Sequence, residues 1–395
     1  MSVWRDVVGQ EAAVEALSRA VGDERLMTHA WLLTGPPGSG RSTAARAFAA
    51  ALQCPAGGCG DCHECHTAAS GAHADVQVVA TEHTYLRLDD VKPLVMLAQQ
   101  RPSAGKWRII IVEDADRLLD DSGNLLLKSI EEPPPRTVWI LCAPSSEDVL
   151  VTIRSRCRHV GLRVPPASAV ADLLVRRDGI DQVVAAYAAR AAQSHIGMAR
   201  RLALDEGARN RRREVLRVPG RLTSVGAAVL AAGELVEVAS EDAKAATTQR
   251  NAEERAALMR SLGAEGVTLL PPAVRSQVRQ LEENQKRRAT RSLRDGLDRA
   301  LVDLLAFYRD VLVTQLGADM VDLVNTDLWV DVDRLARNSS PEDTVRRMDA
   351  IGLARERISA NVAPLLAVEA LMVELMSPGI GARVDRARVK VAGAG

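Results

Sequence analysis

The sequence predicts an α/β domain built on a parallel sheet, followed by a short helical segment and a longer all-helical region. Within residues 1–164, short apolar runs alternate with helical patterns, which is typical of parallel sheets covered by helices. The breaker-rich stretch VPPAS at residues 164–168 then marks a boundary. Beyond it the pattern is helical throughout, and Val274–Leu316 is one long amphipathic stretch.

Five apolar runs are predicted to be strands. They are Ala30–Thr34, Asp75–Val79, Trp107–Val112, Thr137–Cys142 and Arg158–Leu162. Helical patterns between them imply crossover connections, and these make the sheet parallel. We therefore expect an α/β domain over residues 1–164, a small helical domain over 165–208, and an α-helical domain over 209–395.

Length and composition narrow the functional class. At 395 residues, the chain can form two or three domains, each with its own core. Lys+Arg and Asp+Glu both total 51, so a basic protein that coats nucleic acid is excluded and any DNA contact must be local. No run of 18 apolar residues occurs, and the N-terminus MSVWRDVVGQ lacks the basic and apolar regions of a signal peptide. We predict a cytoplasmic protein.

A glycine-rich loop, GPPGSGRS, follows the first strand. Its glycines are Gly35, Gly38 and Gly40. Such a loop, leading into a helix predicted for Thr43–Leu52, presents backbone N–H groups to a phosphate, and the Ser42 hydroxyl is placed to bind Mg²⁺. The sequence therefore indicates a nucleotide-binding P-loop; the alternative is a glycine turn that binds no nucleotide.

Arg41 stands where the P-loop pattern asks for lysine. The planar guanidinium is wider than an ammonium and needs a different geometry around the phosphates, so the exchange is not conservative. We expect no ATP hydrolysis from this site, and binding of ATP and Mg²⁺ stays open.

Two acids, Glu113 and Asp114, follow the strand Trp107–Val112. P-loop ATPases place the acids that hold Mg²⁺ and polarise water at this position, in the order Asp-Glu. Here the order is inverted, and the shorter Asp114 side chain would lie farther from the attacking water. The pair is predicted to be a degraded catalytic site, and the alternative is a helix cap.

Four cysteines are crowded into twelve residues with the spacing C-x4-C-x2-C-x2-C. They are Cys54, Cys59, Cys62 and Cys65. Four thiolates leave no open coordination position, so the spacing predicts a structural Zn²⁺ site. His63 and His66 could replace one cysteine, and free thiols are the alternative. Cys142 and Cys157 are interpreted as buried or unreactive.

The order of these motifs carries a resemblance. The P-loop, the cysteine module, the acidic strand end, LLKSIEEPP at 126–134 and Ser155-Arg156-Cys157 together resemble bacterial clamp-loader AAA+ subunits over roughly residues 6–205. The resemblance implies an AAA+ domain, a helical lid and an α-helical collar within a hetero-pentameric ring. It also implies gamma/tau and delta subunits as partners, and a sliding clamp and primed DNA reached through the complex, with no membrane contact.

The resemblance also assigns roles. It implies that Arg156, preceded by Ser155, is an arginine finger that completes the ATP site of a neighbouring subunit; the alternative is a solvated surface arginine. Arg200 matches the sensor-2 arginine of the lid, with a helix-surface residue as the alternative. At the sensor-1 position the chain reads Ala143-Pro144-Ser145, and proline offers neither a hydroxyl nor an N–H group.

An altered P-loop, inverted acids and a missing sensor hydroxyl beside an intact Ser155-Arg156-Cys157 motif resemble the delta-prime type of subunit in this family. Such a subunit of DNA polymerase III would have no independent enzymatic activity. The alternative is a gamma/tau-type ATPase motor, against which Arg41 and Pro144 count. A stand-alone P-loop enzyme would leave Arg156 without a partner site. A zinc-dependent nucleic-acid module does not fit the 3% aromatic content.

Overall fold

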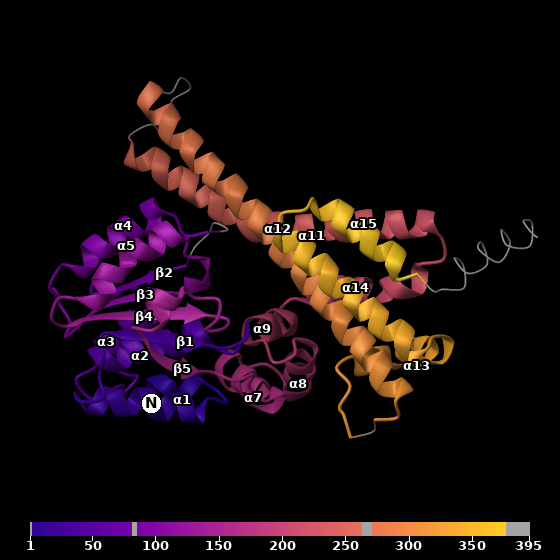
Figure 1. The fold of residues 1–395 in the computed structure, drawn as a ribbon, viewed down its shortest axis with the longest axis horizontal. Helices are drawn as coiled ribbons and strands as arrows, with labels where there is room; N and C mark the ends of the chain where they lie inside the picture. Colours follow the sequence, from indigo (N-terminus) through magenta and orange to yellow (C-terminus); the bar gives the residue numbers. More distant parts are fainter. Residues whose placement is uncertain (1, 81–84, 263–270, 319, 377–395) are drawn as a thin grey trace, which may run out of the picture. The chain divides into compact units, whose positions relative to one another are not determined.

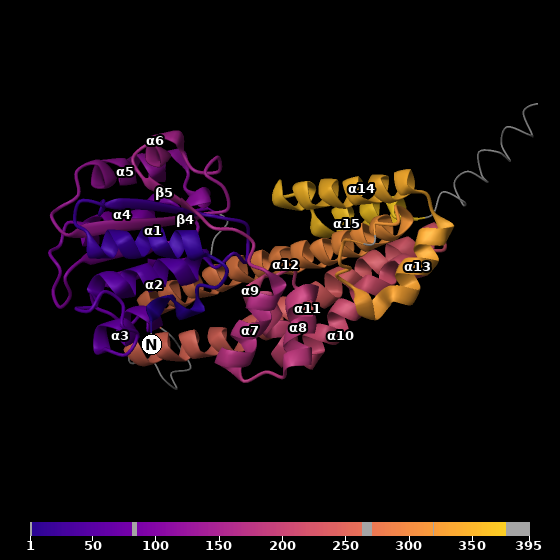
Figure 2. The same ribbon diagram turned by 90° about the horizontal axis from the view of Figure 1, so that it is seen from below.

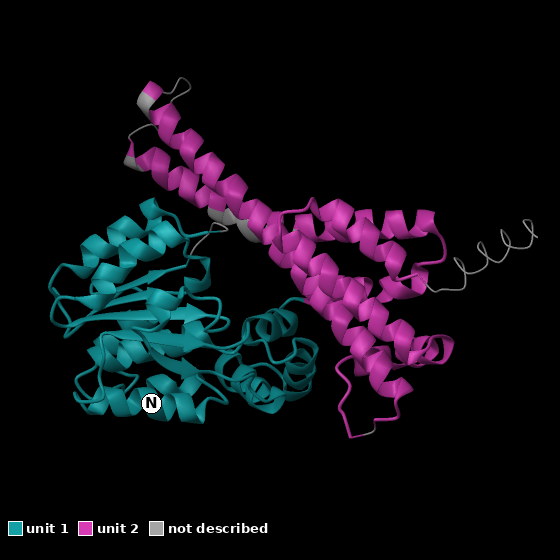
Figure 3. Ribbon diagram, in the orientation of Figure 1, with its two compact units in different colours: residues 1–205 teal, residues 206–395 magenta. Residues whose placement is uncertain are grey.

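The computed structural model describes residues 2–80, 85–262, 271–318 and 320–376, and the chain divides into two compact units. The first is residues 1–205 and the second residues 206–395 (Figure 3). The end of the predicted collar, residues 377–395, lies outside the described part. Each unit has its own core, as the length of the chain allows.

The first unit contains a five-stranded parallel sheet (Figure 1). Its strands are β1 (Ala30–Thr34), β2 (Val76–Val79), β3 (Arg108–Val112), β4 (Thr137–Ala143) and β5 (Arg158–Gly161). They pair in the order β2-β3-β4-β1-β5, with every neighbouring pair parallel. The five predicted strands are confirmed, each to within one residue at either end. Because the strands are parallel, the loops that follow β1, β3 and β4 meet at one edge of the sheet.

Helices cover both faces of this sheet, which is why its central strands are apolar throughout. The helical elements are η1 (Val3–Asp6), α1 (Glu11–Gly22), α2 (Arg41–Gln53), α3 (His63–Ser70), α4 (Leu88–Ala98), η2 (Ala115–Arg117), α5 (Asp120–Glu131) and α6 (Val151–Arg154). Figures 1 and 2 show α2 and α3 on one face and α4 and α5 on the other. Successive β1 residues accordingly enter different cores: Trp31 packs with Phe48 of α2, and Leu32 with Leu126 of α5.

Three short helices complete the first unit. They are α7 (Ala167–Asp178), α8 (Gln182–Ala191) and α9 (Ile196–Leu204). Side chains cap two of them: Asp181 accepts hydrogen bonds from the first backbone N–H groups of α8, and His195 accepts one from Met198 at the start of α9. We propose these helices as the lid; their separation from the sheet domain near residue 164 stays a prediction.

The second unit is helical over its described residues, as the sequence predicted. Its elements are α10 (Glu206–Arg217), η3 (Val218–Arg221), α11 (Val225–Ser261), α12 (Pro272–Gln315), η4 (Thr326–Leu328), α13 (Trp329–Asn338), α14 (Pro341–Ser359) and α15 (Pro364–Glu374). The predicted long helix at 274–316 corresponds to α12, whose Leu297, Leu301 and Leu304 lie in the core of this unit. In the part of the chain that the structure describes, no helix combines the length and the apolar character needed to cross a bilayer.

Candidate functional site

The P-loop connects the end of β1 to the start of α2. Gly38 and Gly40 have φ angles of 84° and 90°, a region that favours glycine, and this lets the chain turn sharply into the helix. Gly35 donates its backbone N–H to the carbonyl of Pro144 at 3.1 Å, so the loop is anchored at the end of β4. The helix begins at Arg41, two residues earlier than predicted, and Ser42 and Thr43 lie in its first turn.

Arg41 folds back onto its own loop. Its Nη1 donates a hydrogen bond to the carbonyl oxygen of Gly35 at 2.8 Å. A lysine at this position of a P-loop instead reaches outward to the β- and γ-phosphates. One nitrogen of the Arg41 guanidinium is thus bonded to the loop itself, a contact that a lysine reaching the phosphates does not make.

The start of α9 packs against the same loop through His195. A Cβ atom added to Gly38 would lie 2.5 Å from Cγ of His195, and one added to Gly40 would lie 3.6 Å from Cδ1 of Ile196. The first turn of α9 therefore packs directly on two of the P-loop glycines. Sequence reasoning missed His195, because nothing in the local pattern distinguishes it from an ordinary helix cap.

This contact predicts that Gly38→Ala destabilises the first unit. The new methyl group would lie 2.5 Å from Cγ and 2.6 Å from Cα of His195, so the imidazole and the backbone must both shift, and overpacking of this kind costs about 1–3 kcal/mol. Gly179→Ala is the matched control, since Gly179 also has a positive φ, 67°, but no atom lies within 4 Å of its added Cβ. Chemical denaturation of both variants measures the difference. Equal losses of stability would show that backbone strain alone, and not His195, sets the cost.

Glu113, the first acid after β3, forms an ion pair with Arg46 of α2. Arg46 Nη2 lies 3.0 Å from Oε1 of Glu113, so the carboxylate that follows β3 already has a partner. Asp114 lies 3.8 Å from Arg117. Burial raises the pKa of Asp116, and the charge of Asp114 acts in the same direction. Arg46 was not among the predicted site residues, because no motif singles out an arginine in the second turn of this helix.

The four predicted zinc ligands converge. All four Sγ atoms lie within 4.8 Å of one another, and neither His63 nor His66 belongs to the cluster. The Sγ of Cys54 lies 3.6 Å from that of Cys59 and 3.7 Å from that of Cys62, and the Sγ atoms of Cys59 and Cys65 are 4.0 Å apart. Tetrahedral zinc with Zn–S bonds of about 2.3 Å requires sulfur atoms about 3.8 Å apart. The cluster therefore fits zinc.

Backbone donors prepare this cluster for thiolates. Burial acts to raise the pKa of Cys54, but the backbone N–H groups of Cys59, Gly58 and Ala56 outweigh it and lower that pKa to about 6. Gly60 donates its N–H to the Sγ of Cys65 at 3.3 Å, but there burial outweighs the hydrogen bond and raises the pKa of the thiol, so metal binding must displace that proton. A thiolate is the form of cysteine that binds metal.

The two remaining cysteines behave differently. Burial raises the pKa of Cys142 and of Cys157 to about 12 in each case. Both remain protonated thiols at neutral pH, in line with their interpretation as buried or unreactive residues.

Arg156 lies at the end of α6 and is exposed. Its Nε contacts Oε1 of Glu131 at 2.5 Å, and its Nη1 donates to the carbonyl of Thr152 at 2.8 Å and to Oγ of Ser155 at 3.2 Å. Two of the three guanidinium nitrogens thus have partners within the chain. The structure places Ser155 and Arg156 together, as the motif requires.

Arg200 is paired within the lid. Its Nε donates to Oδ1 of Asp178 at 2.9 Å, at the end of α7. Burial acts to raise the pKa of Asp178, but hydrogen bonds from Arg177 and Arg200 outweigh it and lower that pKa. In this arrangement His195 and Ile196 contact the P-loop glycines and Arg200 pairs with Asp178, so the sensor-2 role of Arg200 stays a prediction.

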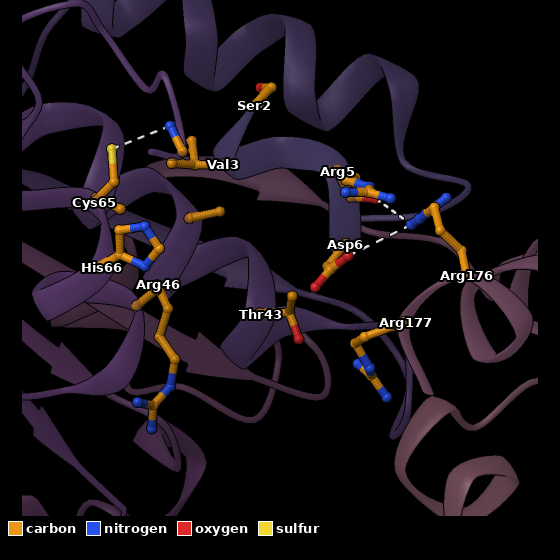
Figure 4. A pocket seen from close by; sticks show the side chains of 14 residues that line it. Ser2, Val3, Arg5, Asp6, Thr43, Arg46, Cys65, His66, Arg176 and Arg177 are labelled. Carbon is orange, nitrogen blue, oxygen red and sulfur yellow. Dashed lines mark hydrogen bonds and ion pairs between the residues drawn. The ribbon is translucent and has the colours of Figure 1, made fainter. Parts of the chain in front are cut away.

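A pocket of about 490 Å³ lies beside α2, between the start of the chain, the cysteine module and α7 (Figure 4). Thr43 and Arg46 line it from α2, and Arg176 and Arg177 from α7. Figure 4 shows that Arg176 reaches the chain start, where it donates to the carbonyl of Arg5 at 2.7 Å. This contact ties the lid to the first residues of the chain.

The first unit is similar in sequence to known proteins. Residues 9–166 match the family model described as DNA polymerase III, delta subunit. A DNA polymerase III subunit gamma/tau of Mycobacterium tuberculosis is 35% identical over 178 residues, and a subunit delta' of Pseudomonas aeruginosa is 34% identical over 168 residues. This part of the chain is therefore similar to gamma/tau and delta' subunits of DNA polymerase III. The resemblance predicted from the motifs is confirmed over this part of the chain.

The similarity to these DNA polymerase III subunits is partial. It covers 44% of this chain and 31% of the gamma/tau relative, and 41% of this chain and 51% of the delta' relative. The chain thus spans about half the length of these relatives or less. Similar solved structures include a DNA polymerase III gamma-subunit-related protein of Thermotoga maritima, with 16% identity, a TM-score of 0.42, and coverage of 92% of this chain and 98% of that one. RuvB of the same organism has 19% identity and a TM-score of 0.37, covering 53% of this chain and 64% of that one.

Proposed function

We propose that the chain is a delta-prime-type subunit of the DNA polymerase III clamp loader. It joins gamma/tau and delta subunits in a hetero-pentameric ring in the cytoplasm, and the ring places a sliding clamp on primed DNA. Its contribution is Arg156, supplied in trans to the ATP site of a neighbouring subunit. It hydrolyses no ATP itself and has no polymerase activity of its own.

One contrast carries this proposal: the residues of the chain's own ATP site depart from the P-loop pattern and Glu113 is paired, whereas the Ser155-Arg156 motif is intact and exposed. Arg41 is bonded to the Gly35 carbonyl, and Arg46 neutralises Glu113, the acid best placed to hold Mg²⁺. Pro144 offers no sensor hydroxyl. Mg²⁺ needs free carboxylate and hydroxyl oxygens, and phosphoryl transfer needs a cation on the γ-phosphate. Glu113, Arg41 and Pro144 thus each depart from what hydrolysis requires, while the Ser42 hydroxyl is retained.

The alternative is a gamma/tau-type ATPase motor. The observation in its favour is that relatives named gamma/tau and relatives named delta' match the chain at similar identity. Sequence identity therefore does not distinguish a delta-prime-type subunit from a gamma/tau-type motor. The distinction depends on the residues of the ATP site. Steady ATP turnover by the isolated chain would decide for the motor.

We also propose that the cysteine module holds one structural Zn²⁺. The ion would be bound by the thiolates of Cys54, Cys59, Cys62 and Cys65, and with four protein ligands it has no open position for substrate. Its chemistry is to cross-link the module. Nucleotide binding would use the P-loop backbone and Thr43, and it does not require hydrolysis.

The isolated chain is expected to show no ATP turnover above a protein-free blank. Arg41→Lys alone should not restore it, because Glu113 stays paired with Arg46 and Pro144 stays without a hydroxyl. The measurement is phosphate release by the purified chain, by the Arg41→Lys variant and by the partner motor subunit as positive control. Turnover by the wild-type chain comparable to the motor, in a preparation free of other ATPases, would replace the delta-prime assignment by the gamma/tau one.

A further inference from the structure

The finger motif is held by a residue outside it. The guanidinium of Arg156 contacts Glu131 through Nε, and Thr152 and Ser155 through Nη1. Its Nη2 has no hydrogen-bond partner among the residues that the structure describes. Two nitrogens of the fork are therefore fixed from within the subunit, and the third remains available to a ligand outside it.

We propose that Glu131 is a positioning residue for Arg156, whose guanidinium it orients so that Nη2 faces the γ-phosphate of the neighbouring subunit. The proposal rests on the trans role of Arg156 given above. A guanidinium binds phosphate oxygens through a planar fork of N–H groups, so the direction of that plane decides whether the contact forms. The Glu131 carboxylate, paired with Nε, would set the direction of the guanidinium plane.

Glu131 is firmly placed for this task because α5 and α6 pack unusually closely. A Cβ atom added to Gly123 of α5 would lie only 2.2 Å from Cδ1 of Leu150, just before α6. Ile130, next to Glu131, and Ile153 of α6 are both buried in the same core cluster. The last residue of α5 therefore cannot drift relative to the finger without disturbing a packed interior.

The ion pair between Glu131 and Arg156 is too weak to matter much for folding, but it can still orient the guanidinium. Glu131 and Arg156 are both exposed, with side chains 42% and 40% accessible. Ion pairs of this kind contribute about 0–1 kcal/mol to folding. A misplacement of about 1 Å at a reacting group, in contrast, can cost about 10²-fold in rate. Loss of Glu131 should thus affect partner turnover far more than the stability of the chain.

The test is Glu131→Gln in the reconstituted complex with wild-type partners. Glutamine keeps the shape and removes the charge that holds Nε. We expect turnover at saturating ATP to fall about 10- to 100-fold at the site that Arg156 serves, with KM and assembly unchanged. Glu132→Gln is the matched control: it removes the adjacent exposed carboxylate, for which the described residues include no side-chain partner, and should leave turnover at the wild-type value.

Two further measurements separate the possible failures. In an Arg156→Ala background, Glu131→Gln should have no additional effect; a further drop would mean that Glu131 acts independently of the finger.

In the isolated chain, the ¹⁵N and ¹H resonances of the Arg156 Nε–H group should shift in Glu131→Gln and not in Glu132→Gln, which tests the contact without any ATP site. Unchanged resonances would overturn the positioning role.

If Arg156→Ala is damaging but Glu131→Gln behaves like Glu132→Gln, the finger stands and the positioning role is wrong. If Arg156→Ala has no effect, the proposed function itself fails. A rise in turnover in Glu131→Gln would show that the carboxylate restrains the finger and would also overturn the proposal.

Discussion

Replacing Arg156 by alanine should lower ATP turnover at the adjoining subunit's site by about 10³- to 10⁵-fold, the range for arginine fingers supplied in trans. This corresponds to about 4–7 kcal/mol of transition-state stabilisation. The physical reason is that negative charge grows on the γ-phosphoryl oxygens in the transition state, and an oriented guanidinium meets it there. Clamp loading and DNA-stimulated turnover should fall together.

Assembly of the complex should survive this change. Arg156 lies in the first unit, whereas the proposed collar lies in the second. Arg156→Lys should be nearly as damaging as Arg156→Ala, because an ammonium cannot reproduce a planar contact through several N–H groups. Arg154→Ala serves as control, since Arg154 is the last residue of α6, two positions before Arg156, and its Nη1 donates to the carbonyl of Ser146.

The complex is reconstituted with each variant and wild-type partners, its size is checked, and turnover and loading are measured. Normal turnover and loading in a correctly sized Arg156→Ala complex would make Arg156 a surface residue. A loss in Arg154→Ala equal to that in Arg156→Ala would instead point to general damage of α6.

Removal of zinc should unfold the cysteine module. Of residues 55–70, only Gly58, Cys65 and Ala68 are buried, so the segment has little apolar surface with which to fold alone. We expect one zinc per chain by elemental analysis, and a loss of about 4 kcal/mol or more of unfolding free energy in Cys62→Ser, as for other structural metals. Acidification should also release the ion, because protons compete with it for the thiolates.

The matched control is Cys157→Ser, which removes a cysteine outside the cluster and should keep one zinc per chain. Amide hydrogen exchange can locate the damage: protection should fall in α3 and at the neighbouring contact of Val3 with the Gly58 carbonyl, which measures 3.1 Å. Wild-type chain purified without chelators and found free of zinc would contradict the site. Zinc retained in Cys62→Ser with unchanged stability would remove Cys62 from the ligand set.

The sequence by itself determined the order of strands and helices, the P-loop and the four cysteines. These features are local: apolar periodicity defines the strands, glycines permit the turn before Arg41, and the four cysteines lie within twelve residues of chain, Cys54–Cys65. The family followed from the order of such local motifs along the chain.

Only the tertiary structure decided which of these residues already have partners. Arg46 meets Glu113, 67 residues away, because α2 packs on the face of the sheet beside β3. His195 reaches Gly38 through the packing of the lid, and Glu131 meets Arg156 through the close approach of α5 and α6. No local pattern encodes these pairs, since a long arginine or glutamate side chain on a helix surface is compatible with many partners until the core sets its position.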